Sequence, residues 1–152
     1  MKLYNILQTE GIIRVNKNDT LSSALNKLSS AHDAAFVQSD EGKYLGVINP
    51  YYCVIKTSSP SNAKLEHSLY HAPHVRLNYP VSKIAQLMIE SKIHYLPVFD
   101  DKDEMVGIVS ARGLLRSLEH LDIFTTKIEE LLSRKRLPLI TVFEDDSLAQ
   151  AM

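Results

Sequence analysis

Two stretches of the chain carry the same order of hydrophobic and polar positions. The first starts at Arg14 and the second at Arg76, and Gly46 falls opposite Gly107 when the two are aligned. In each stretch, apolar residues first recur every three or four positions, as on one face of a helix. Two short β-rich runs follow, joined by a polar turn, which is the signature of a β-hairpin. The pattern therefore predicts an internal repeat.

Each copy predicts a strand, a helix, a hairpin and a second helix. The apolar positions of the first helix are Leu21, Ala24, Leu25 and Leu28 in one copy and Val81, Ile84, Ala85 and Met88 in the other. The hairpin runs are AAFVQ with KYLGVI and YLPVF with MVGIV, and the second helices fall in PYYCVIK and ARGLLRSLEHL. Asp19 or Thr20 suits the cap of the first helix, and Pro80 suits the start of its counterpart. We expect an α/β (α+β) fold of two repeats, each a small sheet with two packed helices.

The end of the chain opens the same pattern a third time. Residues 125–136 have the spacing of a connecting helix, and LPLITVFEDDSLAQAM adds an apolar strand, an acidic turn and new helical spacing. The predicted domains are a first repeat over 1–64, a second repeat over 65–124, and a connecting helix with a truncated third repeat over 125–152. The chain would then be the amino-terminal part of a protein with several such units. The alternative is a terminal strand and helix that complete the two-repeat fold.

Composition and charge narrow the functional classes. A hydrophobic fraction of 45% in 152 residues supports a proper core, and 17 basic against 18 acidic residues leave no broad positive face for nucleic acid. The single Cys53 excludes an internal disulfide, and the amino end lacks the apolar core of a signal peptide. No apolar run approaches the ~20 residues that span a bilayer. We predict a cytoplasmic protein without membrane insertion or a nucleic-acid partner.

Short motifs around the hairpins point to a known family. GVINPYY, LPVFD and GIVSARG follow one another in order, each in its place after the expected helix spacing. On these motifs the chain, over about Ile12 to Leu118, resembles the cystathionine-β-synthase (CBS) domain family. The resemblance implies two repeats that pack by their sheets about a pseudo-twofold axis as a tandem (Bateman) module. It also implies two clefts, which bind adenine nucleotides in many relatives, and a homodimer or pairing with a second CBS module.

The resemblance also assigns ligand positions, where this chain departs from the family. The family pattern is Gly, two apolar residues, Thr or Ser, two variable residues, then Asp. Ser110 matches the hydroxyl of the second copy, but Gly113 replaces the carboxylate, and the first copy has Asn49 and Tyr52 at these places. A carboxylate that accepts from ribose hydroxyls contributes about 1.5 to 3 kcal/mol, so weaker nucleotide binding is expected. Ser110 should cap the helix that begins at Ala111, with or without a ligand.

Further candidate ligand contacts lie in the second copy. They are Arg76, His94, Tyr95, Pro97, Arg112 and Arg116. Arg112 and Arg116 are four apart on one helical face, and would bring two cations to an anionic ligand or else be solvated or paired with carboxylates. The resemblance puts the strand residues of this set where relatives contact a purine. Tyr95, or Phe36 in the first copy, would stack on the base or else be an ordinary core aromatic.

Metal and catalytic sites are not predicted. His67 and His71 have the i, i+4 spacing that places two imidazoles on one helical face, and His74 follows closely. Pro73 would end that helix, and no third ligand stands on a rigid element. The chain has neither a P-loop, nor a dinucleotide fingerprint, nor a recognisable triad.

Two functional hypotheses remain open. The first is a non-catalytic regulatory module without a required cofactor, in which AMP, ADP, ATP or S-adenosylmethionine binds in the cleft between the repeats. The ligand would favour one arrangement of the repeats, which a partner reads as a conformational or oligomeric change. The second is an interaction or dimerisation scaffold without a ligand, which the departures at Asn49, Tyr52 and Gly113 favour.

Overall fold

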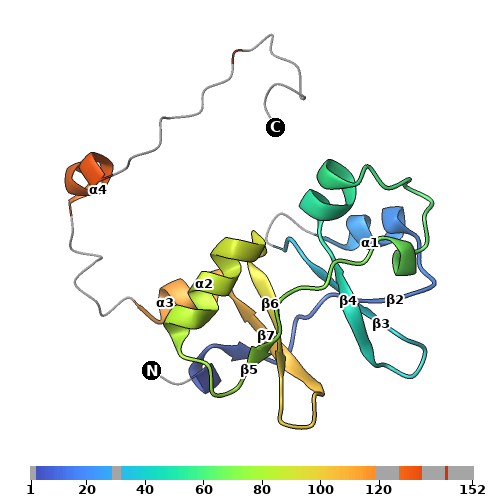
Figure 1. Ribbon diagram of the computed structural model, residues 1–152, viewed down its shortest axis with the longest axis horizontal. Coiled ribbons are helices and arrows are strands. Elements are labelled where there is room, and N and C mark those ends of the chain that lie inside the picture. Colours follow the sequence, from blue (N-terminus) through green and yellow to red (C-terminus); the bar gives the residue numbers. More distant parts are fainter. Residues whose placement is uncertain (1–2, 29–31, 119–126, 135–142, 144–152) are drawn as a thin grey trace. The chain divides into compact units, whose positions relative to one another are not determined.

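The computed structural model describes residues 3–28, 32–118, 127–134 and 143, which are coloured in Figure 1. Met1–Glu119 and His120–Met152 form two separate compact units. In the second unit, helix α4 (Ile128–Arg134) corresponds to the connecting helix expected within 125–136. The predicted third repeat falls outside the described residues, apart from the exposed Phe143.

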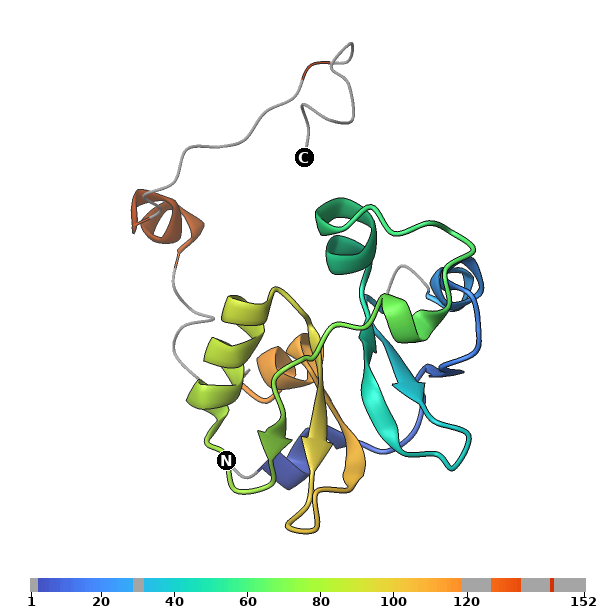
Figure 2. The same cartoon turned by 45° about the vertical axis from the view of Figure 1, so that its right-hand side comes forward.

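Two small sheets form the first unit (Figures 1 and 2). The strands are β1 (Leu7–Gln8), β2 (Arg14–Asn16), β3 (Ala35–Gln38), β4 (Tyr44–Ile48), β5 (Val75–Arg76), β6 (Tyr95–Phe99) and β7 (Met105–Ser110). One sheet has the order β2-β3-β4 and the other the order β1-β7-β6-β5. The hairpins β3–β4 and β6–β7 are antiparallel, whereas β2–β3 and β5–β6 are parallel. The expected α/β (α+β) fold of two repeats is confirmed.

Helices and short helical turns complete the two repeats. They are η1 (Leu3–Asn5), α1 (Leu21–Lys27), η2 (Tyr51–Lys56), η3 (Leu65–His67), α2 (Val81–Ser91) and α3 (Ala111–Arg116). Thr20 is the N-cap of α1, since its side chain accepts a hydrogen bond from Ser23 N at 3.3 Å. Pro80 precedes α2, where its fixed φ suits the helix start. The second helices lie where the sequence predicts them, but η2 has a different hydrogen-bond pattern.

The segment Tyr51–Lys56 is a single π-helical turn and not the expected α-helix. Thr57 N donates to Tyr52 O at 3.2 Å, five residues back, which is the hydrogen bond of a π-helix. The Thr57 hydroxyl donates to the same carbonyl at 3.0 Å and to Cys53 O at 3.1 Å. These side-chain hydrogen bonds satisfy two carbonyl groups at the end of the turn, and the π-helical turn stops there.

The segment that leads into each repeat pairs with the sheet of the other repeat. β1 pairs antiparallel with β7, and Tyr70, ahead of β5, forms a bridge with β4. A Cβ on Gly107 would lie 2.6 Å from Gln8 O, and a Cβ on Gly46 would lie 3.1 Å from Tyr70 O. The two equivalent glycines are therefore needed because a crossing backbone approaches each of them closely.

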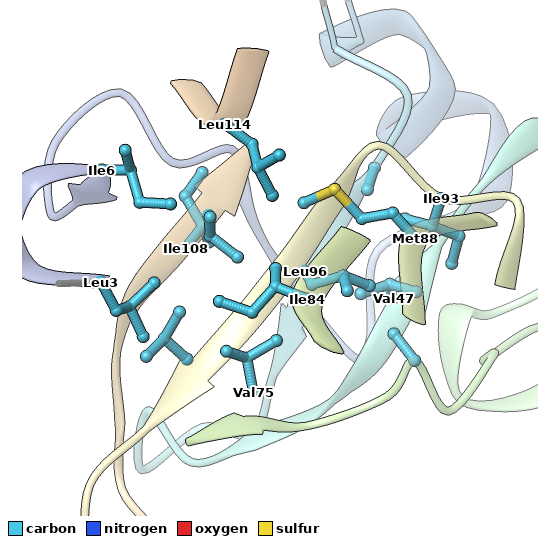
Figure 3. Packing of buried hydrophobic residues seen from close by; sticks show 14 of the residues in the cluster. Leu3, Ile6, Val47, Val75, Ile84, Met88, Ile93, Leu96, Ile108 and Leu114 are labelled. Carbon is cyan, nitrogen blue, oxygen red and sulfur yellow. The ribbon is translucent and has the colours of Figure 1, made fainter. Parts of the chain in front are cut away.

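One hydrophobic cluster is shared by both repeats, and Figure 3 shows part of it. It combines Val47 and Phe36 from the first sheet with Leu96 and Ile108 from the second, all at most 1% exposed. A smaller cluster around α1 contains Leu65, from the segment that leads into the second repeat. Each fully buried side chain of this size contributes about 1.5 to 3 kcal/mol, so neither repeat keeps its core without the other.

Candidate functional site

The two predicted hydroxyl positions, Asn49 and Ser110, lie at the ends of β4 and β7 and are 2% and 1% exposed. Ser110 is the N-cap of α3, as predicted, because its Oγ accepts from Gly113 N at 3.1 Å. The same Oγ accepts from Gln8 Nε2 at 3.3 Å. A Cβ at Gly113 would lie 3.2 Å from this oxygen and 3.7 Å from Ile6 O. Residues 6–8, which lead into the first repeat, therefore lie directly against the ligand positions of the second repeat.

Asn49 takes the corresponding role at the start of η2 without a hydroxyl. Its Oδ1 accepts from Tyr51 N at 3.0 Å, and its Nδ2 donates to Asp33 O at 2.7 Å. Both polar atoms of the amide are thus engaged by the protein. This capping role explains how Asn stands at a position where the family pattern has Thr or Ser.

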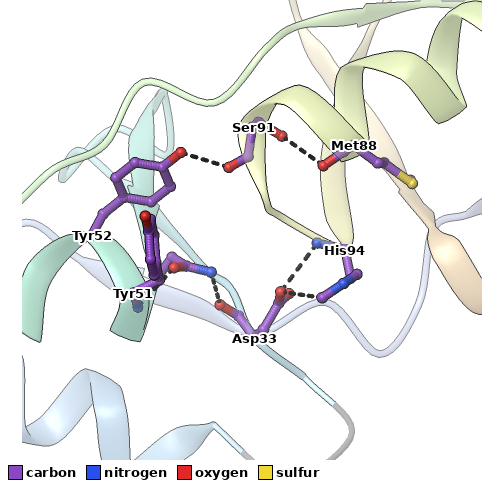
Figure 4. Close-up of polar contacts among 7 residues, drawn as sticks. Asp33, Tyr51, Tyr52, Met88, Ser91 and His94 are labelled. Carbon is purple, nitrogen blue, oxygen red and sulfur yellow. Dashed lines mark hydrogen bonds and ion pairs between the residues drawn. The ribbon is translucent and has the colours of Figure 1, made fainter. Parts of the chain in front are cut away.

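Asp33, which the sequence motifs did not single out, joins the two repeats (Figure 4). Its Oδ2 accepts from His94 N at 3.1 Å and lies 2.7 Å from His94 Nδ1. Its Oδ1 is buried without a hydrogen-bond partner. The carbonyl of His94 in turn accepts from Ala111 N at 2.8 Å, which connects the contact to the start of α3.

Tyr52, at the carboxylate position of the first copy, makes two contacts that the sequence does not predict. Its ring stacks on Tyr70, with centroids 3.7 Å apart and planes at 11°. Its hydroxyl donates to Ser91 O, at the end of α2, at 2.6 Å (Figure 4). Removal from water raises the pKa of Tyr52 to about 12, and the neighbouring Tyr70 adds to the shift. Tyr52 therefore donates as a neutral phenol at physiological pH.

A pocket of about 160 Å³ lies between η2 and residues 67–70, in the segment that leads into the second repeat. Tyr52, Leu69 and Tyr70 supply its apolar part, and Lys56, Thr57, Ser59, His67 and Ser68 supply polar groups. Lys56 Nζ lies 5.9 Å from the centroid of the Tyr52 ring. Ser68 Oγ is buried and has no hydrogen-bond partner. The pocket thus offers an aromatic wall and a cation, and one of its lining residues holds an unsatisfied hydroxyl buried just beneath the surface.

The arginines of the predicted site lie elsewhere. Arg76 donates to Asp100 O at 2.7 Å and pairs with Asp103 Oδ1 at 2.6 Å, so it supports the β6–β7 turn. Arg112 and Arg116 are exposed on α3. The structure therefore does not bring these three cations to the pocket beside Tyr52.

The strand residues of the predicted site do not line this pocket either. Pro97 is buried within β6, and Phe36 is 1% exposed, so neither offers a face to a ligand. Tyr95 is half-buried and stacks on His32, with centroids 5.0 Å apart. His94 is exposed and bonded to Asp33. Among the predicted ligand residues, only Tyr52 lines the pocket. The polar residues that line the pocket are not recognisable from the sequence, because they lie outside the family motifs.

A second hollow, of about 220 Å³, lies between α2 and α3. Its lining is Ala85, Met88, Ile89, His94, Ala111, Leu114 and Leu115. Ile89 is 78% exposed and Leu115 is 56% exposed. The resemblance implies pairing with a second CBS module, but the sequence predicts neither this groove nor its lining.

The three clustered histidines do not share a helical face. η3 ends at His67, and the chain from Ser68 to His74 is not helical, so the helix inferred from their spacing is wrong. His67 Nε2 lies 3.5 Å from Glu66, and His74 stacks on Phe99 with centroids 4.0 Å apart. Within the described ranges, no three His, Cys, Asp or Glu side chains are placed to hold a metal ion. None of the helices in that part of the chain is long and apolar enough to cross a membrane.

Comparison with known proteins agrees with this geometry. Residues 70–120 match the CBS domain family. An uncharacterized protein of Methanocaldococcus jannaschii is 23% identical over 112 residues, or 72% of this chain; the chain spans 41% of the length of that relative.

Several solved structures share the fold. A conserved CBS domain protein of unknown function from Thermoplasma acidophilum is 25% identical, with a TM-score of 0.66 over 88% of this chain and 75% of that one. The cytosolic domain of the Mg²⁺ channel MgtE in complex with ATP is 19% identical, with a TM-score of 0.61 over 77% of this chain and 48% of that one. Residues 70–120 therefore match a CBS domain, and residues 3–118, where described, have the fold of a CBS domain pair.

Proposed function

We propose that this protein is a non-catalytic regulatory module that senses an adenine nucleotide or a related adenosyl ligand. The observation that carries the proposal is the pocket between η2 and residues 67–70, with Tyr52 at its wall and the unsatisfied Ser68 hydroxyl buried beneath its lining. A buried hydroxyl without a partner is costly unless a ligand or water completes it. The ATP complex of a protein with the same fold supports the choice of nucleotide.

The dimensions of the pocket suggest which part of the ligand enters it. Small-molecule sites commonly measure about 300 to 1,000 Å³, so a pocket of about 160 Å³ takes a single ring system. A purine would lie against Tyr52 and Leu69, and rotation of the buried Ser68 hydroxyl about its Cα–Cβ bond would let it bond to the base. Lys56, on the rim, would attract the phosphates. Since neither repeat has the ribose carboxylate of the family pattern, the affinity should be lower than with that group.

Thermal unfolding with AMP, ADP, ATP or S-adenosylmethionine tests the proposal. Ligand at 100 times its dissociation constant stabilises by about 2.7 kcal/mol, which raises Tm by several degrees. Lys56→Met should reduce the shift with a phosphorylated ligand, whereas Lys102→Met, on the exposed β6–β7 turn, should not. Titration calorimetry of the variants Ser110→Ala and Arg112→Ala distinguishes this pocket from the ligand positions of the second repeat.

Ser68→Ala gives the sharper result, because its two expected effects have opposite signs. It removes an unsatisfied buried hydroxyl, so the unliganded protein should be as stable as wild type or more stable. It also removes a bond to the ligand, so the ligand-dependent shift should fall. An undiminished shift in this variant would mean that the ligand binds elsewhere, and no shift with any ligand in wild type would reject nucleotide sensing.

The scaffold remains the second candidate, and the apolar groove between α2 and α3 favours it. A second CBS module, from another copy of this chain or from another protein, would cover Ile89 and Leu115. Light scattering of wild type and Ile89→Glu measures this. A dimer that the variant abolishes supports the scaffold, with or without nucleotide binding. A cytoplasmic location and the lack of a nucleic-acid partner or required cofactor stay predictions from the sequence.

A further inference from the structure

Tyr52 belongs to the pocket and to the contact between the repeats at once. Its ring is a wall of the pocket and stacks on Tyr70, while its hydroxyl reaches out of the first repeat to Ser91 O at 2.6 Å (Figure 4). A tyrosine side chain has only two rotatable bonds. A ligand that moves the ring away from Tyr70 must therefore also move the hydroxyl away from Ser91.

Ser91 is the last residue of α2, where helix carbonyls lack intrahelical donors. The next residue, Lys92, has a φ of 53°, a left-handed conformation at which glycine is usual. The Tyr52 hydroxyl supplies a donor to this helix end. Ser91 Oγ in turn donates to Met88 O at 3.5 Å, and Met88 lines the groove between α2 and α3. A short series of contacts therefore leads from the pocket to the exposed face of the second repeat.

We infer that the hydrogen bond from Tyr52 to Ser91 is the contact through which occupancy of the pocket changes the end of α2. A purine that displaces the Tyr52 ring from Tyr70 as it stacks on it breaks this bond, and the end of α2 loosens beside the groove, whereas the Asp33–His94 contact keeps the two repeats together. The identity of the ligand in this mechanism rests on the proposed function, but the contact between Tyr52 and Ser91 does not. Its coupling can thus be measured with and without ligand.

Hydrogen exchange of residues 88–94 in the unliganded protein tests the contact. Tyr52→Phe keeps the ring and removes only the donor, so these amides should exchange about 2- to 10-fold faster than in wild type. Tyr51→Phe is the matched control: it removes the hydroxyl that accepts from Lys92 Nζ at 3.2 Å, on the same turn but outside the pocket. Equal exchange in Tyr52→Phe and wild type, or equal acceleration in both variants, would overturn the inference.

The same measurement with AMP tests the coupling, at a concentration that saturates wild type. AMP should accelerate exchange of residues 88–94 in wild type to about the rate of unliganded Tyr52→Phe. If AMP binds and exchange at these residues does not change, the inference is overturned and the proposed function stands. If none of the four adenine ligands binds, the proposed function fails, and the unliganded comparison of Tyr52→Phe with Tyr51→Phe still decides whether Tyr52 holds the end of α2.

Discussion

Asp33 and His94 occupy equivalent positions in the two repeats and are bonded to each other. Asp33 stands two residues before Ala35, which pairs with Ile48, the last apolar residue of the first hairpin. His94 stands two residues before Leu96, which pairs with Val109, the last apolar residue of the second hairpin. Equivalent residues that touch must lie on the axis relating the repeats. The pseudo-twofold axis therefore passes through a contact between a carboxylate and an imidazole.

This contact should contribute measurably to the association of the repeats. Asp33→Ala and His94→Ala should each destabilise the protein, and the double variant should lose less than the sum, with a coupling of about 1 kcal/mol. The exposure of the two side chains, 28% for Asp33 and 69% for His94, keeps the coupling from being larger. Urea unfolding of the four proteins measures it. Strictly additive losses would mean that the contact contributes nothing.

Replacement of the two equivalent glycines should have unequal effects. In Gly107→Ala the new methyl group would lie 2.6 Å from Gln8 O and 2.8 Å from Leu7 Cδ1, which forces β1 away from β7. In Gly46→Ala the nearest atom, Tyr70 O, would be 3.1 Å away, and a small shift suffices. We expect Gly107→Ala to lose about 1 to 3 kcal/mol in urea unfolding and Gly46→Ala to lose less. The reverse order would contradict the closer approach of β1.

Much of this fold follows from local pattern. Each copy encodes its own helix spacing and its own hairpin, and Ser110 can be recognised as a helix cap because it stands directly before the helical residues in the sequence. The exchange of leading segments is not local, because β1 and Tyr70 pair with strands far along the chain. The pocket was missed for the same reason. Its Ser68 hydroxyl and its Tyr52 wall are brought together only by that crossing.

The left-handed residue at the end of α2 gives a test of backbone strain. Lys92 has a φ of 53°, and its Nζ donates to Tyr51 OH at 3.2 Å. Lys92→Gly and Lys92→Ala both remove that side-chain contact, but only glycine adopts this conformation without strain. Lys92→Gly should therefore be about 1 kcal/mol more stable than Lys92→Ala in chemical unfolding. Equal stability would mean that the helix end relaxes to another conformation in the alanine variant.

His74 should make stability fall in mildly acidic solution. Partial burial, with its ring against Phe99 and near Tyr44, lowers the pKa of His74 below the usual 6.5, and Arg76 adds to this while Asp103 opposes it. The unfolded chain takes up the proton at about pH 6.5, whereas the folded protein resists it. The stabilising effect is therefore complete above pH 6.5 and is lost as the pH falls through the folded-state pKa.

Thermal unfolding of wild type and His74→Gln between pH 5 and pH 8 measures this effect. Gln keeps a polar side chain that does not titrate, so the variant should show a smaller loss of stability below pH 6.5 than wild type. His71→Gln removes a neighbour whose charge makes only the smallest contribution to the lowered pKa of His74, so this variant should keep most of the pH dependence of wild type. Parallel curves for wild type and His74→Gln would show that the ring is protonated equally easily in the folded and unfolded chain.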